Sequence, residues 1–281
     1  MKTVYTVNEV RNIIKEWKSK GLSIGFVPTM GYLHEGHKSL IEKAAAENDK
    51  VVVSIFVNPI QFGPGEDYKS YPRNLKRDEK ICEPAGVNLI FAPSSSEMYL
   101  KNGCTYVNVE GITECLCGEK RAGHFKGVCT IVAKLFYILA PNKAYFGEKD
   151  AQQLAVIKRM VQDLNFEIEI VGCPIVREAD GLAKSSRNTY LLLEERKAAL
   201  VLKRCLDSAT EILNHGERNV EAITKVILRE LDLEPLAIID YVEIVDSCTL
   251  KPVQTVESSI LVAIAVFIGK TRLIDNFTFQ S

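Results

Sequence analysis

The stretch from residue 22 to residue 48 does most to limit the folds open to this chain. Residues 22–27 form a short apolar segment that ends at Pro28, which is typical of a buried strand. Apolar residues then recur at helical spacing, so we expect a helix that begins near Gly36 and ends near Asn48. A strand that enters a helix through a short polar turn predicts a β–α unit, the building block of a parallel sheet.

The same alternation of strand and helix continues to about residue 177. Strands are predicted at 50–57, 87–91, 143–146 and 166–171, and helices at 7–20, 74–85, 123–139 and from 151 to 164. The strand at 50–57 is apolar throughout, as strands covered on both faces are. This pattern predicts an α/β, Rossmann-like, doubly wound and mostly parallel sheet with right-handed crossovers.

From about residue 178 the pattern changes. Helices are predicted at 194–214 and 220–231, and three strands follow at 238–245, 260–268 and 273–279 with no helix between them. Strands in direct succession favour an antiparallel sheet. We therefore expect two domains, a Rossmann-like domain over residues 1–177 and a smaller α+β C-terminal domain over residues 178–281.

Charge and hydropathy exclude several classes of protein. The net charge is −1 and no basic run is present, so binding to long nucleic acid is not expected. The N-terminus lacks the apolar core of a signal peptide, and the longest apolar run, 260–268, is too short to span a bilayer. We expect a cytoplasmic protein with no membrane partner.

The 8 cysteines could suggest disulfides or a metal site, but their positions do not. Cys82, Cys129, Cys205 and Cys248 lie singly among apolar residues, where a thiol behaves as a small hydrophobic group. Cys115 and Cys117 are the only close pair, and no histidine lies near them at zinc-ligand spacing. We expect free thiols and no protein-bound metal.

Two histidines mark the turn after the first strand. His34 and His37 lie three residues apart, on one face of the first helical turn. The N–H groups and the dipole of a helix N-terminus favour an anion, and imidazoles beside them can donate to phosphate oxygens. Gly36 lets a phosphate approach the backbone closely. The alternative is that a histidine at this position only caps the helix.

Three further polar segments could serve a nucleotide site. The loop 58–65 follows a buried strand, at the sheet edge where ligands bind in open parallel sheets. The turn 147–150 follows another strand and contains Lys149, a point charge suited to phosphates. The hydroxyls and guanidinium of 185–187 also suit phosphate oxygens. Asp150 could instead be a plain helix cap.

Four motifs together resemble the pantothenate synthetase (pantoate–β-alanine ligase) family. They are Pro28-Thr29-Met30-Gly31 with His34-Glu35-Gly36-His37, Phe56-Val57-Asn58-Pro59-Ile60-Gln61-Phe62, Gly147-Glu148-Lys149-Asp150 with Gln152-Gln153, and Ser185-Ser186-Arg187-Asn188. The resemblance extends from the first strand to the C-terminus. It implies a fold similar to that of nucleotidylyltransferases and class I aminoacyl-tRNA synthetases. It also implies condensation of pantoate with β-alanine, using ATP and Mg²⁺, through a pantoyl-adenylate with release of AMP and pyrophosphate. A homodimer formed through the nucleotide domain is implied as well.

The resemblance also implies roles for individual residues. The catalytic residues would be His34, His37, Lys149 and Arg187, with His37 as the proton donor. The ATP-binding residues would be Met30, Gly31, His34, Gly36, His37, Gly147, Glu148, Lys149, Asp150, Val176, Lys184, Ser185, Ser186 and Arg187. The substrate-binding residues would be Gln61 and Gln153, with Asn58, Met30, Phe62 and Tyr71 as pocket walls. A surface amide is the alternative for each glutamine. The loop 184–187 is expected to be mobile and to close over the triphosphate.

Arg121 and His124 match a family stretch, but a solvated helix start would explain them nearly as well. The chain departs from the family at Lys184, where methionine is usual, and at Ala151, where an aromatic residue is common. These departures bear on ATP affinity and not on the reaction. A nucleotidylyltransferase of the same fold is the main alternative, but it gives no role to the two glutamines. A tRNA synthetase, which would need an anticodon domain, and a catalytically inactive nucleotide sensor are further alternatives.

Overall fold

In the computed structural model, which describes residues 1–280, the chain forms two compact units. Unit 1 consists of residues 1–110, 121–148 and 153–174. Unit 2 consists of residues 111–120, residues 149–152 and the chain from residue 175 onward. The last break lies close to the predicted boundary after residue 177. The two short segments of unit 2 that lie earlier in the chain were not anticipated from the sequence.

Unit 1 is built on a sheet of six parallel strands. They are β1 (Lys2–Val4), β2 (Ile24–Thr29), β3 (Lys50–Ile55), β4 (Leu89–Phe91), β5 (Lys143–Gly147) and β6 (Glu169–Cys173). Their order in the sheet is β1-β4-β3-β2-β5-β6, and every neighbouring pair is parallel. The predicted α/β, doubly wound class is confirmed. Strand β1, too short to give a periodic signal, was not predicted.

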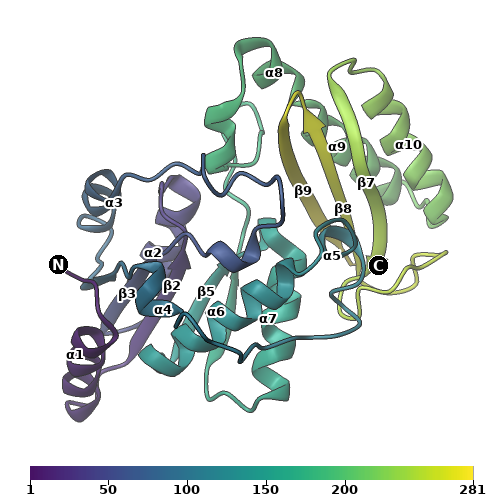
Figure 1. The fold of residues 1–281 in the computed structure, drawn as a ribbon. Helices are drawn as coiled ribbons and strands as arrows, with labels where there is room; N and C mark the ends of the chain where they lie inside the picture. The colour runs from purple at the N-terminus through teal and green to yellow at the C-terminus, as the bar shows by residue number, and fades with distance from the viewer. Residues whose placement is uncertain (281) are drawn as a thin grey trace. The chain divides into compact units, whose positions relative to one another are not determined.

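Helices cover both faces of this sheet (Figure 1). The helices of unit 1 are α1 (Val7–Ser19), α2 (Glu35–Glu47), α3 (Leu75–Cys82), α4 (Ser95–Met98), α6 (His124–Leu139) and α7 (Ala151–Asp163). Successive residues of β2 show the two faces. Phe26 packs edge-on against Phe136 of α6, with ring centroids 6.3 Å apart. Val27 belongs to a buried cluster with Ile41 of α2. Burial on both sides explains why the central strands are apolar throughout.

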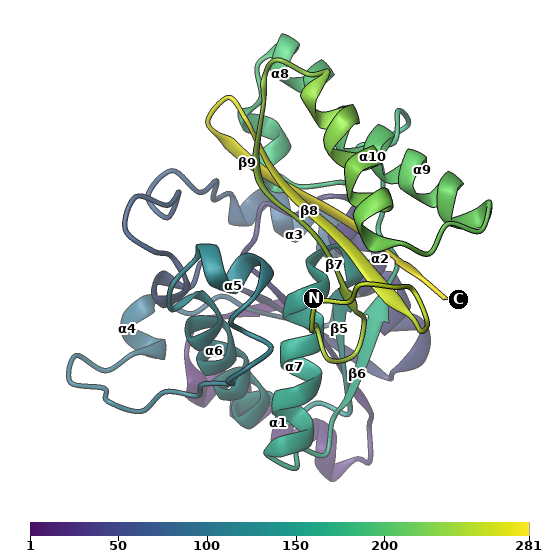
Figure 2. The same ribbon diagram turned by 90° about the vertical axis from the view of Figure 1, so that its right-hand side faces the viewer.

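Unit 2 contains a three-stranded antiparallel sheet, as predicted. Its strands are β7 (Ala237–Asp246), β8 (Ile260–Ile268) and β9 (Thr271–Phe279), in that order. Helices α9 (Val201–Asn214) and α10 (Val220–Asp232) pack against each other and against the sheet (Figure 2). The short helices α5 (Leu116–Lys120) and α8 (Leu193–Ala198) also belong to this unit.

The prediction of one continuous helix over 194–214 was wrong, because α8 ends before α9 begins. Between them the backbone tightens, and Leu200 N–H donates to the carbonyl of Lys197, three residues back. The run Ala198-Ala199-Leu200-Val201-Leu202 is apolar without a break, so a straight helix could not turn all of it inward. The tightened turn lets Ala199, Val201 and Leu202 all enter the core.

The apolar run 260–268 is strand β8, which is buried over nearly its whole length. None of the helices described between residues 1 and 280 has the length and apolar character needed to cross a membrane.

Candidate functional site

Three loops of unit 1 leave the same edge of the parallel sheet. Strand β2 lies between β3 and β5 in the sheet. From β2 the chain passes through α2 to β3 on one side of β2, and only later in the sequence does it form β5 on the other side. The carboxyl ends of β2 and β5 therefore form a topological switch point, where open α/β sheets bind their ligands. The turn 30–34 follows β2, the loop 56–66 follows β3, and Gly147 and Glu148 lie at the end of β5. The predicted site residues of unit 1 are on these loops, apart from Gly36 and His37 in the first turn of α2, and from Tyr71 and Gln153.

The two histidines are fixed by the start of α2. His34 is the N-cap residue, and its Nδ1 accepts a hydrogen bond from Gly36 N–H at 3.2 Å. The Nδ1 of His37 accepts one from His34 N–H at 3.3 Å, and the ring centroids are 4.1 Å apart. A neutral imidazole whose Nδ1 accepts carries its proton on Nε2. Capping and anion binding therefore use different ring nitrogens, and the capping interpretation does not compete with the functional one.

Two residues of α3 form hydrogen bonds with the backbone of the turn before these histidines. Nothing in the sequence singled them out. Asp78, 1% exposed, accepts hydrogen bonds from Tyr32 N–H at 2.9 Å and Leu33 N–H at 2.7 Å. Arg77 donates to the carbonyl of Leu33 at 2.7 Å. Burial raises the pKa of Asp78 although both N–H groups oppose this. In the sequence the pair stands in a charged stretch and looks like a solvated helix face.

The turn itself has an unusual backbone. Gly31 has φ +84°, and a Cβ there would lie 2.9 Å from Ile55 Cγ2 and 3.0 Å from Asp78 Oδ2. Tyr32 also has a positive φ, +52°, which is uncommon for a residue with a side chain. The hydrogen bonds that Asp78 accepts from Tyr32 and Leu33 N–H hold this conformation, which brings the chain from β2 into α2.

Gln61 lies in a short 3-10 turn, η1 (Pro59–Gln61), and is only 9% exposed. Its Oε1 accepts from Asn58 Nδ2 at 3.0 Å, and its Nε2 contacts Met30 Sδ at 3.3 Å. Asn58 is 1% exposed and accepts from Tyr99 Oη at 2.6 Å. The surface-amide alternative is therefore wrong for Gln61, and the structure brings three of the predicted substrate residues into contact.

The remaining predicted wall residues, Phe62 and Tyr71, lie edge to face with ring centroids 6.1 Å apart. Tyr71 is 6% exposed, so its ring belongs to the interior of unit 1. Gln153 lies in the first turn of α7 and is half-buried. Its role in substrate binding stays a prediction.

The predicted phosphate loop is in unit 2. Lys184 N–H donates to the carbonyl of Val176 at 2.9 Å, so these two predicted ATP residues are neighbours. Ser185 caps the 3-10 helix η3 (Ser186–Tyr190) by accepting from Arg187 N–H at 3.2 Å. Asn188 donates to Glu178 at 3.1 Å, which tethers the end of the loop. The backbone N–H of Lys184 is thus bonded to the segment that precedes the loop.

The turn after β5 continues into unit 2. Residues 148–150 form the 3-10 turn η2, in which Glu148 and Asp150 are exposed and Lys149 is half-buried. Asn276 Nδ2 donates to the carbonyl of Lys149 at 2.8 Å.

Gln152 has a structural role that the sequence did not indicate. It is 6% exposed, accepts from Cys117 N–H at 2.9 Å and donates to the carbonyl of Cys115 at 2.8 Å. It therefore holds the segment before α5.

Neither a metal cluster nor a disulfide is found in the part of the chain that the structure describes. No group of three His, Cys, Asp or Glu residues between positions 1 and 280 could hold a metal ion. All eight cysteines are unpaired, including Cys115 and Cys117.

The Pantoate-beta-alanine ligase family model matches residues 2–278 of the chain. A pantothenate synthetase of Clostridium botulinum is 64% identical over 280 residues, which cover 100% of both chains. One from Clostridium acetobutylicum is 63% identical over the same length. Among solved structures, pantothenate synthetase from Thermus thermophilus is 48% identical and superimposes with a TM-score of 0.94, covering 99% of each chain. Pantoate-beta-alanine ligase from Francisella tularensis, solved with β-γ ATP and β-alanine, is 37% identical with a TM-score of 0.77, covering 99% of this chain and 97% of its own. With this match from end to end, the chain belongs to the pantoate–β-alanine ligase family.

Proposed function

We propose that the chain condenses pantoate with β-alanine in an ATP-dependent reaction that passes through a pantoyl-adenylate. The observation that carries the proposal is the histidine pair, whose Nδ1 atoms are both held by backbone N–H groups at the switch-point edge of the sheet. The Francisella relative was solved with an ATP compound and β-alanine, which supports the same two ligands here.

In the first step a carboxylate oxygen of pantoate attacks the α-phosphorus of ATP. A phosphorus–oxygen bond forms on one side, and the bond to the β-phosphate bridging oxygen breaks on the other, so pyrophosphate leaves. Charge moves onto the leaving group as this happens. Donors already aimed at that charge stabilise the transition state most. The Nε2 atoms of His34 and His37 would be these donors, with His37 giving its proton toward the phosphates.

Cationic and hydroxyl groups of unit 2 would offset the charge of the triphosphate. Lys149 and Arg187 supply the charge, while Ser185 and Ser186 supply hydroxyl groups. Mg²⁺ would enter with ATP, since it is commonly bound through substrate phosphates rather than by a dedicated protein cage.

In the second step the amine of β-alanine attacks the acyl carbon, AMP leaves, and the amine gives up a proton. Pantoate has two hydroxyl groups beside its carboxylate. An amide can donate to and accept from such hydroxyls without adding charge near the reacting carboxylate. Gln61, whose amide is already oriented by Asn58, would serve this role with Gln153. Met30 and Phe62 would supply apolar surface for the gem-dimethyl group.

The test is exchange of labelled pyrophosphate into ATP. We expect exchange to require pantoate and Mg²⁺ but not β-alanine, because the adenylate forms before the amine enters. Mass analysis of the complete mixture should then find pantothenate and AMP. Exchange that depends on β-alanine would overturn the two-step order, and exchange without pantoate would favour a nucleotidylyltransferase. Sedimentation of the purified protein tests the predicted homodimer separately.

A further inference from the structure

The loop that carries Gln61 is bonded to the first turn of α6. His124 Nδ1 lies 2.8 Å from the carbonyl oxygen of Gln61, and His124 Nε2 lies 2.9 Å from Arg121 Nη1. A guanidinium only donates, so Nε2 of His124 accepts and Nδ1 carries the ring proton. His124 is therefore neutral and donates to Gln61. It is 8% exposed, so the solvated-helix-start interpretation is wrong for it.

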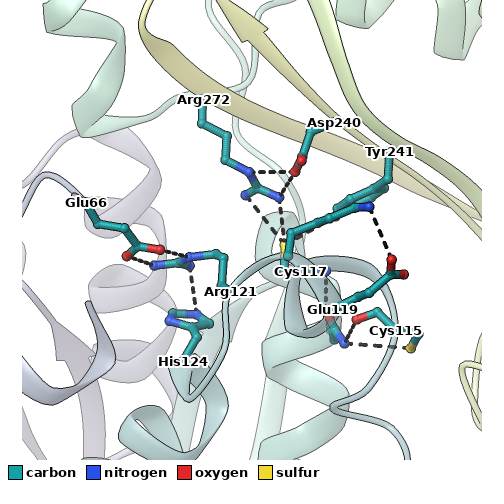
Figure 3. Close-up of polar contacts among 11 residues, drawn as sticks. Glu66, Cys115, Cys117, Glu119, Arg121, His124, Asp240, Tyr241 and Arg272 are labelled. Carbon is teal, nitrogen blue, oxygen red and sulfur yellow. Dashed lines mark hydrogen bonds and ion pairs between the residues drawn. The ribbon is translucent and has the colours of Figure 1, made fainter. Parts of the chain in front are cut away.

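Glu66 fixes Arg121 from the other side. The two form a bidentate ion pair, with Nε to Oε1 and Nη2 to Oε2 both at 2.7 Å (Figure 3). Burial alone would raise the pKa of Glu66, but the hydrogen bonds and charge of Arg121 outweigh it and lower that pKa. A bidentate pair fixes the plane of the guanidinium as well as its position. Glu66 lies five residues after Gln61, so both ends of this contact chain are on one loop.

The same helix turn also touches the loop backbone directly. A Cβ at Gly127 would lie 2.5 Å from the carbonyl oxygen of Ile60 and 2.6 Å from Gln61 Cα. The carbonyl of Gly127 accepts from Asn58 Nδ2 at 3.1 Å, and Asn58 also donates to the Gln61 amide. His124 and Gly127 lie three residues apart and therefore face the same way. The loop thus contacts α6 at Asn58 and Gln61, and contacts Arg121 in the turn before α6 at Glu66.

We propose that Glu66, Arg121 and His124 are positioning residues that fix the backbone and the amide orientation of Gln61. This inference rests on the proposed role of Gln61 in substrate binding. These residues act through Gln61, so their loss should weaken pantoate binding and leave ATP binding nearly unchanged. An ion pair between the loop and the turn that precedes α6 would thereby set substrate affinity without touching substrate.

Two amide substitutions of His124 separate its contact with the Gln61 carbonyl from its contact with Arg121. The side-chain nitrogen of His124→Asn takes the place of Nδ1 and keeps a donor for the Gln61 carbonyl. The longer His124→Gln places its amide near Nε2 and loses that donor. We expect the KM for pantoate to rise on the order of tenfold in His124→Gln, the size of one lost hydrogen bond, and about threefold or less in His124→Asn. Lys126→Gln, an exposed change on the same helix turn, is the matched control.

A double-substitution cycle distinguishes positioning from general destabilisation. In a Gln61→Ala background the side chain to be positioned is gone, so adding His124→Gln should change the pantoate KM less than about twofold. Full additivity, or equal rises in the KM for ATP and pantoate, would overturn the proposal. Should His124→Gln fail to fold, Glu66→Gln repeats the test, with an expected rise of about threefold.

The failure of this inference and that of the proposed function have different signatures. If wild-type enzyme shows pantoate-dependent pyrophosphate exchange while His124→Gln and Glu66→Gln keep the wild-type pantoate KM, only the positioning role is overturned. If wild-type enzyme shows no such exchange, the proposed function itself is wrong.

Discussion

Asp78 is a single buried carboxylate on which the histidine turn depends. It satisfies two consecutive N–H groups at a place where Tyr32 has a positive φ. A buried N–H without a partner costs about 1–3 kcal/mol. The two backbone hydrogen bonds of the histidines depend on the shape of this turn. Asp78, which contacts the turn through its backbone, therefore influences where the Nε2 atoms of the histidines lie.

Asp78→Asn preserves the shape of the side chain but replaces one acceptor with an NH₂ group that faces an N–H donor. We expect kcat to fall on the order of tenfold. Displacement of the turn would move the histidines and remove about one hydrogen bond that stabilises the transition state. Steady-state kinetics with ATP varied, together with thermal unfolding, measure the effect. Glu83→Gln, an exposed change just after the same helix, is the control. Wild-type kcat in a folded Asp78→Asn enzyme would contradict the role given to this carboxylate.

Among the elements, α2 and β5 are joined through one acidic side chain. Glu47, in the last turn of α2, accepts from Lys43 at 2.7 Å and from Tyr145 of β5 at 2.9 Å. Lys143 of β5 adds a third contact at 3.3 Å. The hydrogen bonds from Lys43, Tyr145 and Lys143 lower the pKa of Glu47 from 4.5 to about 2. This contact ties the C-terminal end of the helix to the strand beside β2.

The pKa of Glu47 gives this contact a defined pH dependence. Because the folded-state pKa lies below the unfolded value, the stabilisation is present above about pH 4.5 and is lost as pH falls toward about 2. We expect Glu47→Gln to lower the melting temperature near neutral pH and to differ less from wild type near pH 2. Melting curves across this range are the measurement, and Glu42→Gln, on the same helix, is the control. A difference that does not shrink with acid would mean that the charge of Glu47 plays no part.

At the scale of the whole molecule, the cysteines divide by burial. Cys104 and Cys248 are exposed. Burial raises the pKa of Cys129 and Cys205 to about 12, and that of Cys173 to about 11. Thiols react as thiolates, so a buried group with a raised pKa is both inaccessible and largely unreactive.

We therefore expect a thiol reagent near neutral pH to modify Cys104 and Cys248 quickly and the other six cysteines slowly. After denaturation all eight should react. Absorbance of the released reagent group follows both phases. A Cys104→Ser, Cys248→Ser double variant should lose the fast phase. Fewer than eight reactive thiols in denatured protein that was never oxidised would contradict the free-thiol assignment.

Local pattern determined much of this protein. Apolar segments with period two or with no polar break became strands, and a 3.6-residue period became helices, because burial of each element is decided largely by its own side chains. The location of the turn with His34 and His37 could be predicted for the same reason. A turn between a strand and the helix that follows it must lie at the carboxyl end of that strand. The parallel direction of the strands followed from the β–α alternation.

Only the tertiary structure decided which polar side chains are held by distant partners. Asp78 reaches back 45 residues to Leu33, and His124 reaches 63 residues to Gln61. In the sequence, nothing singled out Asp78, and a solvated helix start was the alternative for His124. The continuous apolar run at 198–202 likewise gave no sign of the turn between α8 and α9. A local pattern reports how much of a residue is buried, but a hydrogen bond between distant segments depends on the angle and register at which two elements meet, and those are fixed by packing of the whole unit.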